Sequence, residues 1–317
     1  MVDLKEINIL LSPQKMREVF KEKREEIDYS KEILDVKIET IKKYTDWRSF
    51  SLVILYTINE EKKIIGVANS DKEQEYAFQS NQFIFNYLSS IEKENIAPKP
   101  YCYIKELGLF LEQFLEGENF GKEIKEGKEI REEQISEIIK VISLIQGAKI
   151  EQCPLKKGID FYDIKNNISI LKERREEEGK EIENIFSSIE REIREYEQQN
   201  KVFVHGDLNP YNIFFKEERI RLIDFGLAHQ GSKACDLANL ISHFETSLDF
   251  NIEKEKVNLL ERIAINNYQK ETKEEIAEEE YNTYKKYFNL LNFSHVMVWG
   301  DEINKKTISN KIKLINR

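Results

Sequence analysis

The pattern of apolar and polar positions changes character along the chain. In the first third, the apolar runs are short and rich in strand-forming residues, and the strongest covers residues 52–58. A polar turn, Asn59-Glu60-Glu61, follows this run, as expected between two antiparallel strands. The pattern therefore predicts a small sheet whose first three strands cover residues 35–42, 50–58 and 62–69.

The spacing of apolar residues then becomes helical, which predicts a helix over residues 72–91. Two more strands are expected over 101–104 and 108–114, and the second runs into an acidic, glycine-containing segment. We place a boundary between two lobes near this segment. The prediction is an N-lobe over residues 1–116 and a C-lobe over residues 117–317.

The C-lobe is mostly helical in pattern, apart from short apolar runs that predict a strand, a loop and a hairpin over residues 201–223. Charge runs such as residues 172–178 are typical of solvated helix faces with ion pairs four residues apart. The predicted helices cover residues 129–148, 160–178, 181–199, 236–246, 253–270, 273–292 and 301–313.

The predicted loop and hairpin contain the candidate catalytic and metal-binding residues. Residues 205–212 read His-Gly-Asp-Leu-Asn-Pro-Tyr-Asn, and an Asp-Phe-Gly triplet begins at Asp224. Phosphoryl transfer needs a carboxylate to orient the acceptor hydroxyl and oxygen ligands for metal ions on the phosphates. Asp207 suits the first task. Asn212 and Asp224 suit the second, because carboxylate and amide oxygens are good Mg²⁺ ligands.

Composition narrows the classes of partner. The 317 residues include 59 acidic and 49 basic side chains, a formal charge of −10 that argues against nucleic acid as a partner. The first residues lack the basic start and apolar core of a secretory signal, and no apolar run approaches the roughly 18 residues of a membrane helix. We expect a cytoplasmic protein with no membrane partner, and the oligomeric state stays open.

The segment 205–212, together with Leu222-Ile223-Asp224-Phe225-Gly226 and Asp236-Leu237-Ala238, resembles the aminoglycoside phosphotransferase and choline kinase family. This resemblance implies an α+β, bilobal protein-kinase-like fold, with a small antiparallel-sheet N-lobe and a large helical C-lobe. It also implies ATP with Mg²⁺ and a small-molecule hydroxyl acceptor that is aminoglycoside-, choline- or sugar-like. By position, Asp207 matches the family's catalytic base, and Asn212 and Asp224 match its metal ligands.

The resemblance extends to residues outside these roles. His205 and Asp236 match structural positions of the family. Gly206 stands where typical protein kinases have Arg, which argues against a protein kinase regulated through an activation loop. The segment 109–117 resembles the family's hinge, so the backbone groups of Glu112 and Phe114 are expected to bind adenine.

The chain departs from the kinase pattern on the phosphate side. No glycine precedes Gly66, so the glycine-rich loop over the phosphates is missing, and residues 44–49 are a candidate replacement. The third strand also lacks a lysine at its far end, where a Lys paired with a helix Glu normally holds the phosphates. Lys63 or Lys72 are the candidates for this lysine, with Glu75 as the partner on the helix.

Two other functions remain open on the sequence. The motifs also resemble an atypical protein kinase or ATPase, such as the small kinase of the tRNA threonylcarbamoyl-adenosine assembly or the RIO kinases, although those are more compact before the catalytic loop. The missing lysine also fits a nucleotide-binding pseudokinase. Intact Asp207, Asn212 and Asp224 favour an active enzyme over a pseudokinase.

Overall fold

The chain forms two compact units, Met1–Gly117 with Arg221–Leu227, and Glu118–Ile220 with Ala228–Arg317. Their structure is known from a computed structural model. The prediction of separate nucleotide-binding and substrate-binding lobes that meet at residue 116 stays a prediction. The structure describes residues 4–45, 50–69, 74–150, 155–156, 158–199, 201–217 and 219–300.

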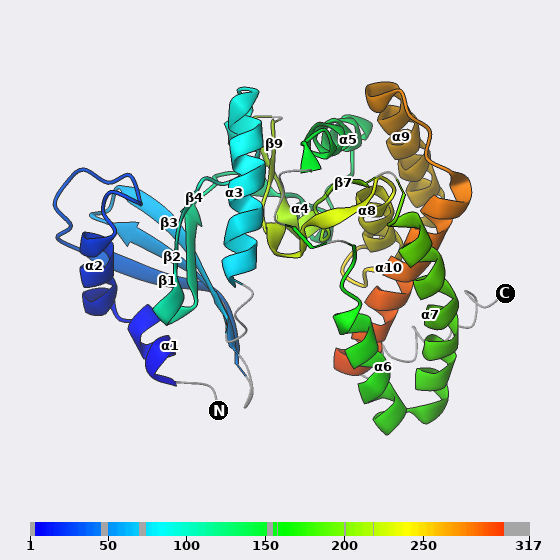
Figure 1. Cartoon of the computed structure of the whole chain (residues 1–317), viewed down its shortest axis with the longest axis horizontal. Coiled ribbons are helices and arrows are strands. Elements are labelled where there is room, and N and C mark those ends of the chain that lie inside the picture. Colours follow the sequence, from blue (N-terminus) through cyan, green and yellow to red (C-terminus); the bar gives the residue numbers. More distant parts are fainter. Residues whose placement is uncertain are drawn as a thin grey trace. The chain divides into compact units, whose positions relative to one another are not determined.

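The first unit is built on a five-stranded antiparallel sheet in the order β1-β2-β3-β5-β4 (Figure 1). All five strands lie within three residues of the predicted ones, because strand-forming runs separated by polar turns are a strong local signal. The strands are β1 (Val36–Thr45), β2 (Phe50–Ile58), β3 (Lys62–Asn69), β4 (Pro100–Ile104) and β5 (Leu109–Gln113).

Helices cover both faces of this sheet. Helices α1 (Leu4–Leu10) and α2 (Pro13–Glu22), which were not predicted, pack their apolar residues into one core with the strands. The Ser12 side chain caps the start of α2, and Pro13 suits the first turn because it lacks an N–H that would need a partner. The predicted helix on the other face is α3 (Gln74–Ser90).

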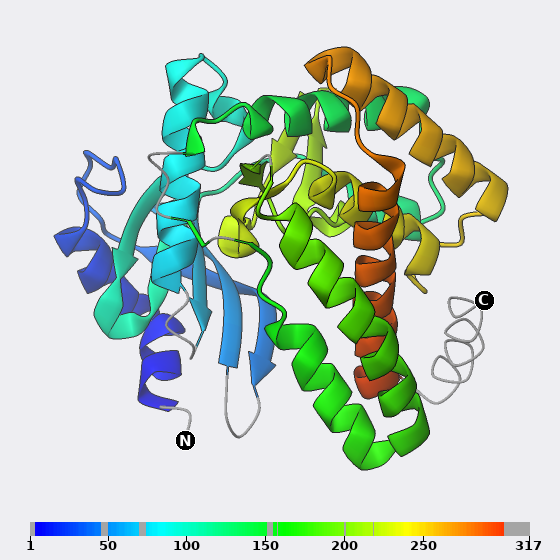
Figure 2. The same ribbon diagram turned by 45° about the vertical axis from the view of Figure 1, so that its right-hand side comes forward.

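The second unit is mainly helical. Three of its helices lie side by side, α6 (Tyr162–Arg174), α7 (Glu176–Tyr196) and α10 (Glu278–Trp299) (Figure 2). Its remaining elements are α4 (Phe120–Lys125), α5 (Glu132–Gln146), α8 (Cys235–Thr246), α9 (Lys254–Thr272), β6 (Glu118–Asn119), β7 (Lys201–Val204), β8 (Ile213–Lys216), β9 (Arg219–Leu222), which crosses the unit boundary, and β10 (His229–Ser232).

The predicted α+β fold with a small antiparallel sheet followed by a helical part is confirmed, and some helix boundaries differ. Helix α6 ends at Arg174 rather than near residue 178, because the chain turns there into α7. A Cβ atom on Gly179 would lie 2.6 Å from the backbone nitrogen of Lys172, so glycine is needed for this close crossing. Helix α10 runs to Trp299, seven residues beyond the prediction, and the helix predicted over 301–313 lies outside the described residues.

None of the helices in the described part of the chain is both long and apolar enough to cross a membrane.

Candidate active site

The predicted catalytic residue Asp207 lies in the loop between β7 and β8 of the second unit, and the structure fixes its carboxylate through neighbours in the same loop. The side-chain amide of Asn209 donates to Asp207 Oδ1 at 2.9 Å. The amide nitrogen of Asn212 donates to both Asp207 Oδ2 and the Asp207 backbone oxygen, each at 2.9 Å. Because the nitrogen of Asn212 is used in these bonds, its Oδ1 atom is the one suited to a metal ion.

Asn209 sets the local conformation that brings Asp207 and Asn212 together. Its Oδ1 atom accepts from the backbone N–H of Tyr211 at 2.9 Å and caps the single helical turn Pro210–Asn212. This capping is typical of Asn immediately before a helical turn that begins with Pro. The turn returns the chain over five residues, so the side chain of Asn212 reaches Asp207.

His205 and Asp236 form a buried support beneath the loop. Both are fully buried, and the carboxylate of Asp236 on α8 accepts from the backbone N–H groups of His205 at 3.0 Å and Gly206 at 3.1 Å. His205 Nδ1 lies 3.4 Å from the backbone nitrogen of Asp207. These bonds tie the start of the loop to α8, in keeping with the structural role expected for both residues.

Two further residues of the second unit lie close enough to Asp207 to feel its charge. Burial lowers the pKa of His243 on α8, and the negative charge of Asp207 opposes this shift. Desolvation raises the pKa of Asp163 on α6, and the charges of Asp160 and Asp207 raise it further, while His295 lowers it. Helices α6 and α8 therefore each bring a titratable side chain within electrostatic reach of Asp207.

The remaining predicted metal ligand, Asp224, belongs to the first unit. It begins the turn Phe225–Leu227 and has a φ of 65°, a left-handed conformation that non-glycine residues seldom adopt. Its Oδ1 atom accepts from the backbone N–H of Gly226 at 3.4 Å. Such strained backbone is concentrated at functional sites, where the surrounding structure maintains it.

Glu112 and Phe114, predicted to bind adenine through their backbone, lie at the end of β5. Glu112 is paired on both sides, with Ile65 on β3 and Pro100 on β4, whereas Phe114 follows the last residue of the strand. The backbone of Phe114 is therefore better placed to bind a ligand than the backbone of Glu112, which lies between two neighbouring strands. The side chain of Glu112 turns to α3, where Asn81 Nδ2 donates to its Oε2 atom at 2.7 Å.

The structure does not join Lys63 and Glu75 as an ion pair. Lys63 is the second residue of β3, so it lies at the start of the strand. Its ammonium group is 5.2 Å from the centre of the Phe114 ring. Glu75 is exposed in the first turn of α3, and its charge contributes to the raised pKa of Tyr103 on β4. Lys72 and residues 46–49 of the candidate phosphate cover lie outside the described residues.

The sequence prediction missed Asn81 and Asn209. Asn209 carried a usable signal, since an Asn before Pro within a catalytic motif is a strong candidate for a turn cap. Asn81 carried none, because its role depends on contact with Glu112, which is 31 residues away in the chain.

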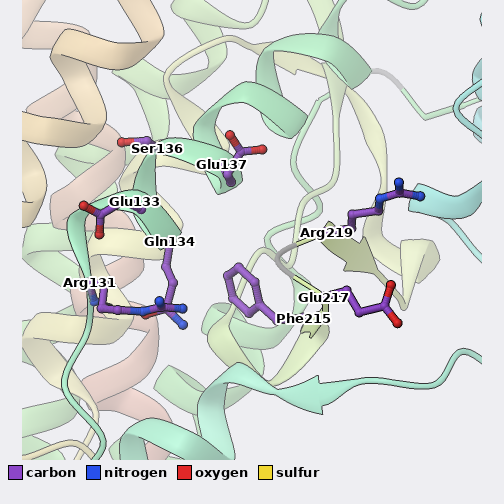
Figure 3. A pocket seen from close by; sticks show the side chains of 8 residues that line it. All are labelled: Arg131, Glu133, Gln134, Ser136, Glu137, Phe215, Glu217 and Arg219. Atoms are coloured by element: carbon purple, nitrogen blue, oxygen red, sulfur yellow. Dashed lines mark hydrogen bonds between the residues drawn. The ribbon is translucent and has the colours of Figure 1, made fainter.

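A separate pocket of about 500 Å³ opens in the second unit, between the start of α5 and the β8–β9 hairpin. Phe215 lies near its centre, with Arg131 and Gln134 on one side and Arg219 on the other (Figure 3). Its other lining side chains include three glutamates, so charges of both signs surround it, and none of the predicted site residues contributes.

Comparison with solved structures supports the fold assignment. The streptomycin–ATP–APH(2")-IIa ternary complex is 16% identical, covers 94% of this chain and 95% of its own, and has a TM-score of 0.60. A putative aminoglycoside phosphotransferase from Ralstonia eutropha is 13% identical over 88% and 90%, with a TM-score of 0.58. Choline kinase from Cryptosporidium parvum is 17% identical over 88% and 89%, with a TM-score of 0.51.

At these identities the likeness establishes a protein-kinase-like fold. A search of curated proteins gave no significant match. The sequence profile of the phosphotransferase enzyme family matches residues 70–268, which is more than half of the chain and includes the loop of Asp207 and the turn of Asp224. The chain therefore belongs to the phosphotransferase enzyme family and is a kinase.

Proposed function

We propose that this kinase transfers the γ-phosphoryl group of ATP, with Mg²⁺, to a hydroxyl group of a small molecule. The observation that carries the proposal is the pair of hydrogen bonds at Asp207, which fix its carboxylate with the amides of Asn209 and Asn212. A carboxylate held in this way can orient an acceptor hydroxyl and receive its proton. Positioning of this kind is the main contribution that a protein makes to phosphoryl transfer.

Asn212 and Asp224 are the proposed metal ligands. An amide oxygen and a carboxylate are hard donors, and Mg²⁺ usually completes its coordination with phosphate oxygens and water. The metal would neutralise charge on the phosphates during transfer. The backbone at Glu112 and Phe114 is the proposed adenine contact, with more weight on Phe114, and Lys63 and Glu75 remain candidates for the phosphate side.

The acceptor is proposed to be an aminoglycoside-, choline- or sugar-like molecule. Asp163 and His243 lie within electrostatic reach of Asp207 and supply polar groups for such an acceptor. Solved proteins of similar fold include complexes with streptomycin, gentamicin and kanamycin, and a choline kinase. A cytoplasmic location and a lack of nucleic-acid or membrane partners complete the proposal.

A turnover assay tests this function. The protein would be incubated with Mg·ATP and a panel of aminoglycosides, amino alcohols and sugars, and ADP formation measured with a coupled assay. We expect acceptor-dependent ADP formation with at least one class. Nucleotide binding without turnover on the panel would contradict the proposal.

A second candidate function is nucleotide binding without transfer, because Lys63 and Glu75 are not joined as an ion pair. Thermal unfolding with and without Mg·ATP, run beside the turnover assay, separates the two candidates. A ligand that binds only the native state raises the unfolding temperature whether or not it is consumed.

A further inference from the structure

The side chain of Glu112 lies on the sheet face that α3 covers. Residues alternate between the two faces of a strand, so Phe110 and Glu112 of β5 share one face. The ring of Phe110 packs edge-on against Phe78 of α3, with centroids 5.7 Å apart. One turn further along α3, Asn81 meets Glu112, so two neighbouring contacts join this helix to β5.

The contact between Asn81 and Glu112 is a buried hydrogen bond between an amide and a carboxyl group. Asn81 is 1% exposed and Glu112 is 7% exposed, and the 2.7 Å bond joins Asn81 Nδ2 to Glu112 Oε2. Among the residues that the structure describes, Glu112 has no ion-pair partner. Burial, and secondarily the charge of Asp224, raise the pKa of Glu112 to about 8, which favours an uncharged carboxyl at neutral pH. An uncharged acid with a hydrogen-bonded partner can be buried at small cost.

Kinases usually join this helix to the third strand by a lysine–glutamate pair, whereas this bond joins α3 to β5. On β3, Ile65 is in register with Glu112 and lies on the same face of the sheet. Alternate residues of a strand share a face, so Lys63, Val67 and Asn69 lie on this face as well. Asn69 is at the far end of the strand, where the phosphate-binding lysine is expected. Asn69 Oδ1 and Asn81 Oδ1 have no hydrogen-bond partner among the described residues, so the bond from Asn81 ties α3 to β5 rather than to this end of β3.

The same face of α3 packs against the turn that begins at Asp224. A Cβ atom on Gly226 would lie 3.8 Å from Cβ of Ala77, which is four residues before Asn81 on the helix. The backbone N–H of Gly226 in turn points to Asp224 Oδ1. A shift of α3 relative to β5 would therefore move the support of Asp224.

We propose that Asn81 and Glu112 form a positioning pair, whose buried hydrogen bond holds α3 on β5 and thereby fixes the turn that presents Asp224. The pair would fix α3 on the sheet, where Lys63 and Glu75 do not form an ion pair. This inference rests on the proposed role of Asp224 as a metal ligand. Partners that orient a metal ligand without touching the metal are worth on the order of tenfold or more in metal affinity.

The test compares the Mg²⁺ concentration for half-maximal turnover, or for half-maximal stabilisation by ATP, in matched variants. Asn81→Ala and Glu112→Leu remove the bond, and we expect each to raise this concentration on the order of tenfold. Glu112→Gln keeps an oxygen that accepts from Asn81, so it should stay within about twofold of the wild type. The double variant Asn81→Ala/Glu112→Leu should be little worse than either single one.

Phe20→Leu is the matched control, because it weakens the ring contact of α2 with Tyr56 on β2 without touching α3 or the polar bond. It should lower the unfolding temperature and leave the Mg²⁺ requirement unchanged. A Mg²⁺ requirement in Asn81→Ala and Glu112→Leu equal to that of the wild type would overturn the inference. An equal loss in Glu112→Gln and Glu112→Leu would also overturn it, since the charge rather than the bond would then matter.

Two further measurements keep the test decisive. If Asn81→Ala does not fold, the comparison of Glu112→Gln with Glu112→Leu decides alone. Asp224→Asn must itself raise the Mg²⁺ requirement, and if it does not, the metal-ligand role in the proposed function fails. If Asp224→Asn raises it and the variants of the pair do not, only the positioning pair is refuted.

Discussion

The catalytic loop of the second unit and the α3–β5 contact of the first unit organise polar groups in different ways. In the loop, the carboxylate of Asp207 accepts hydrogen bonds from the amides of Asn209 and Asn212, which are two and five residues further along the chain. In the first unit, Asn81 Oδ1 and Gln74 Oε1 are buried without a hydrogen-bond partner among the described residues. The buried acid at this contact, Glu112, accepts a hydrogen bond from the amide of Asn81.

The loop holds the residue proposed to act on the acceptor, whereas the α3–β5 contact lies on the side proposed to bind the phosphates. The loop carries the family's residue types at the spacing that phosphoryl transfer requires. On the phosphate side, Lys63 and Glu75 do not form an ion pair, and we infer that the Asn81–Glu112 bond holds α3 on the sheet. Activity should therefore depend steeply on the loop and only weakly on the lysine predicted from the sequence.

Asp207→Ala gives the largest expected effect. Loss of the group that receives the acceptor proton should lower kcat on the order of 10²- to 10⁴-fold. The circular dichroism spectrum and the binding of Mg·ATP should remain, because the hydrogen bonds of this carboxylate among the described residues lie within its own loop. Turnover within tenfold of the wild type would remove Asp207 from the catalytic role.

Asp236→Ala should produce the next largest effect, on stability. The variant leaves the backbone N–H groups of His205 and Gly206 without their acceptor, and each buried unpaired donor costs roughly 1–3 kcal/mol. We expect a loss of about 2–5 kcal/mol in the free energy of unfolding, measured by urea titration. Asp236→Asn, which keeps one acceptor oxygen, should lose less.

A pH titration probes a second buried acid, Glu197. Its Oε1 atom accepts from the backbone N–H of Ile159 at 2.9 Å and lies 3.7 Å from His229 Nε2, and burial raises its pKa to about 7. Because the folded pKa lies above the unfolded value of 4.5, this stabilising contribution is complete below pH 4.5 and is lost as the pH rises through 7.

We expect Glu197 to make the free energy of unfolding fall by roughly 2 kcal/mol between pH 4.5 and pH 8. The Glu197→Gln variant isolates this contribution, since it does not titrate and should have a flatter profile. Identical profiles for the two proteins, measured by urea unfolding at each pH, would show that Glu197 titrates normally.

Lys63→Met should have the smallest effect. The ammonium group lies over the Phe114 ring and makes no ion pair among the described residues, so kcat/KM for ATP should change by less than about twofold. A loss of tenfold or more would place Lys63 on the phosphates and erase the contrast between the two regions.

The elements read most accurately from the sequence are those with local causes. The strands of the first unit follow from apolar runs and polar turns, and the motif around Asp207 follows from residue types at fixed spacing. Helices α1 and α2 were missed because their stability comes from packing on strands far along the chain. Asn81 was missed for the same reason, since its partner Glu112 is brought near only by the fold.

The two-stranded pairing of β7 with β10 has a consequence for control of the enzyme. Residues 229–232 are hydrogen-bonded in register along residues 201–204, and α8 begins at Cys235, soon after the Asp-Phe-Gly turn. Little chain is left there for a loose segment that a phosphate group could order or release. We therefore do not expect phosphorylation of this stretch to switch the enzyme on or off.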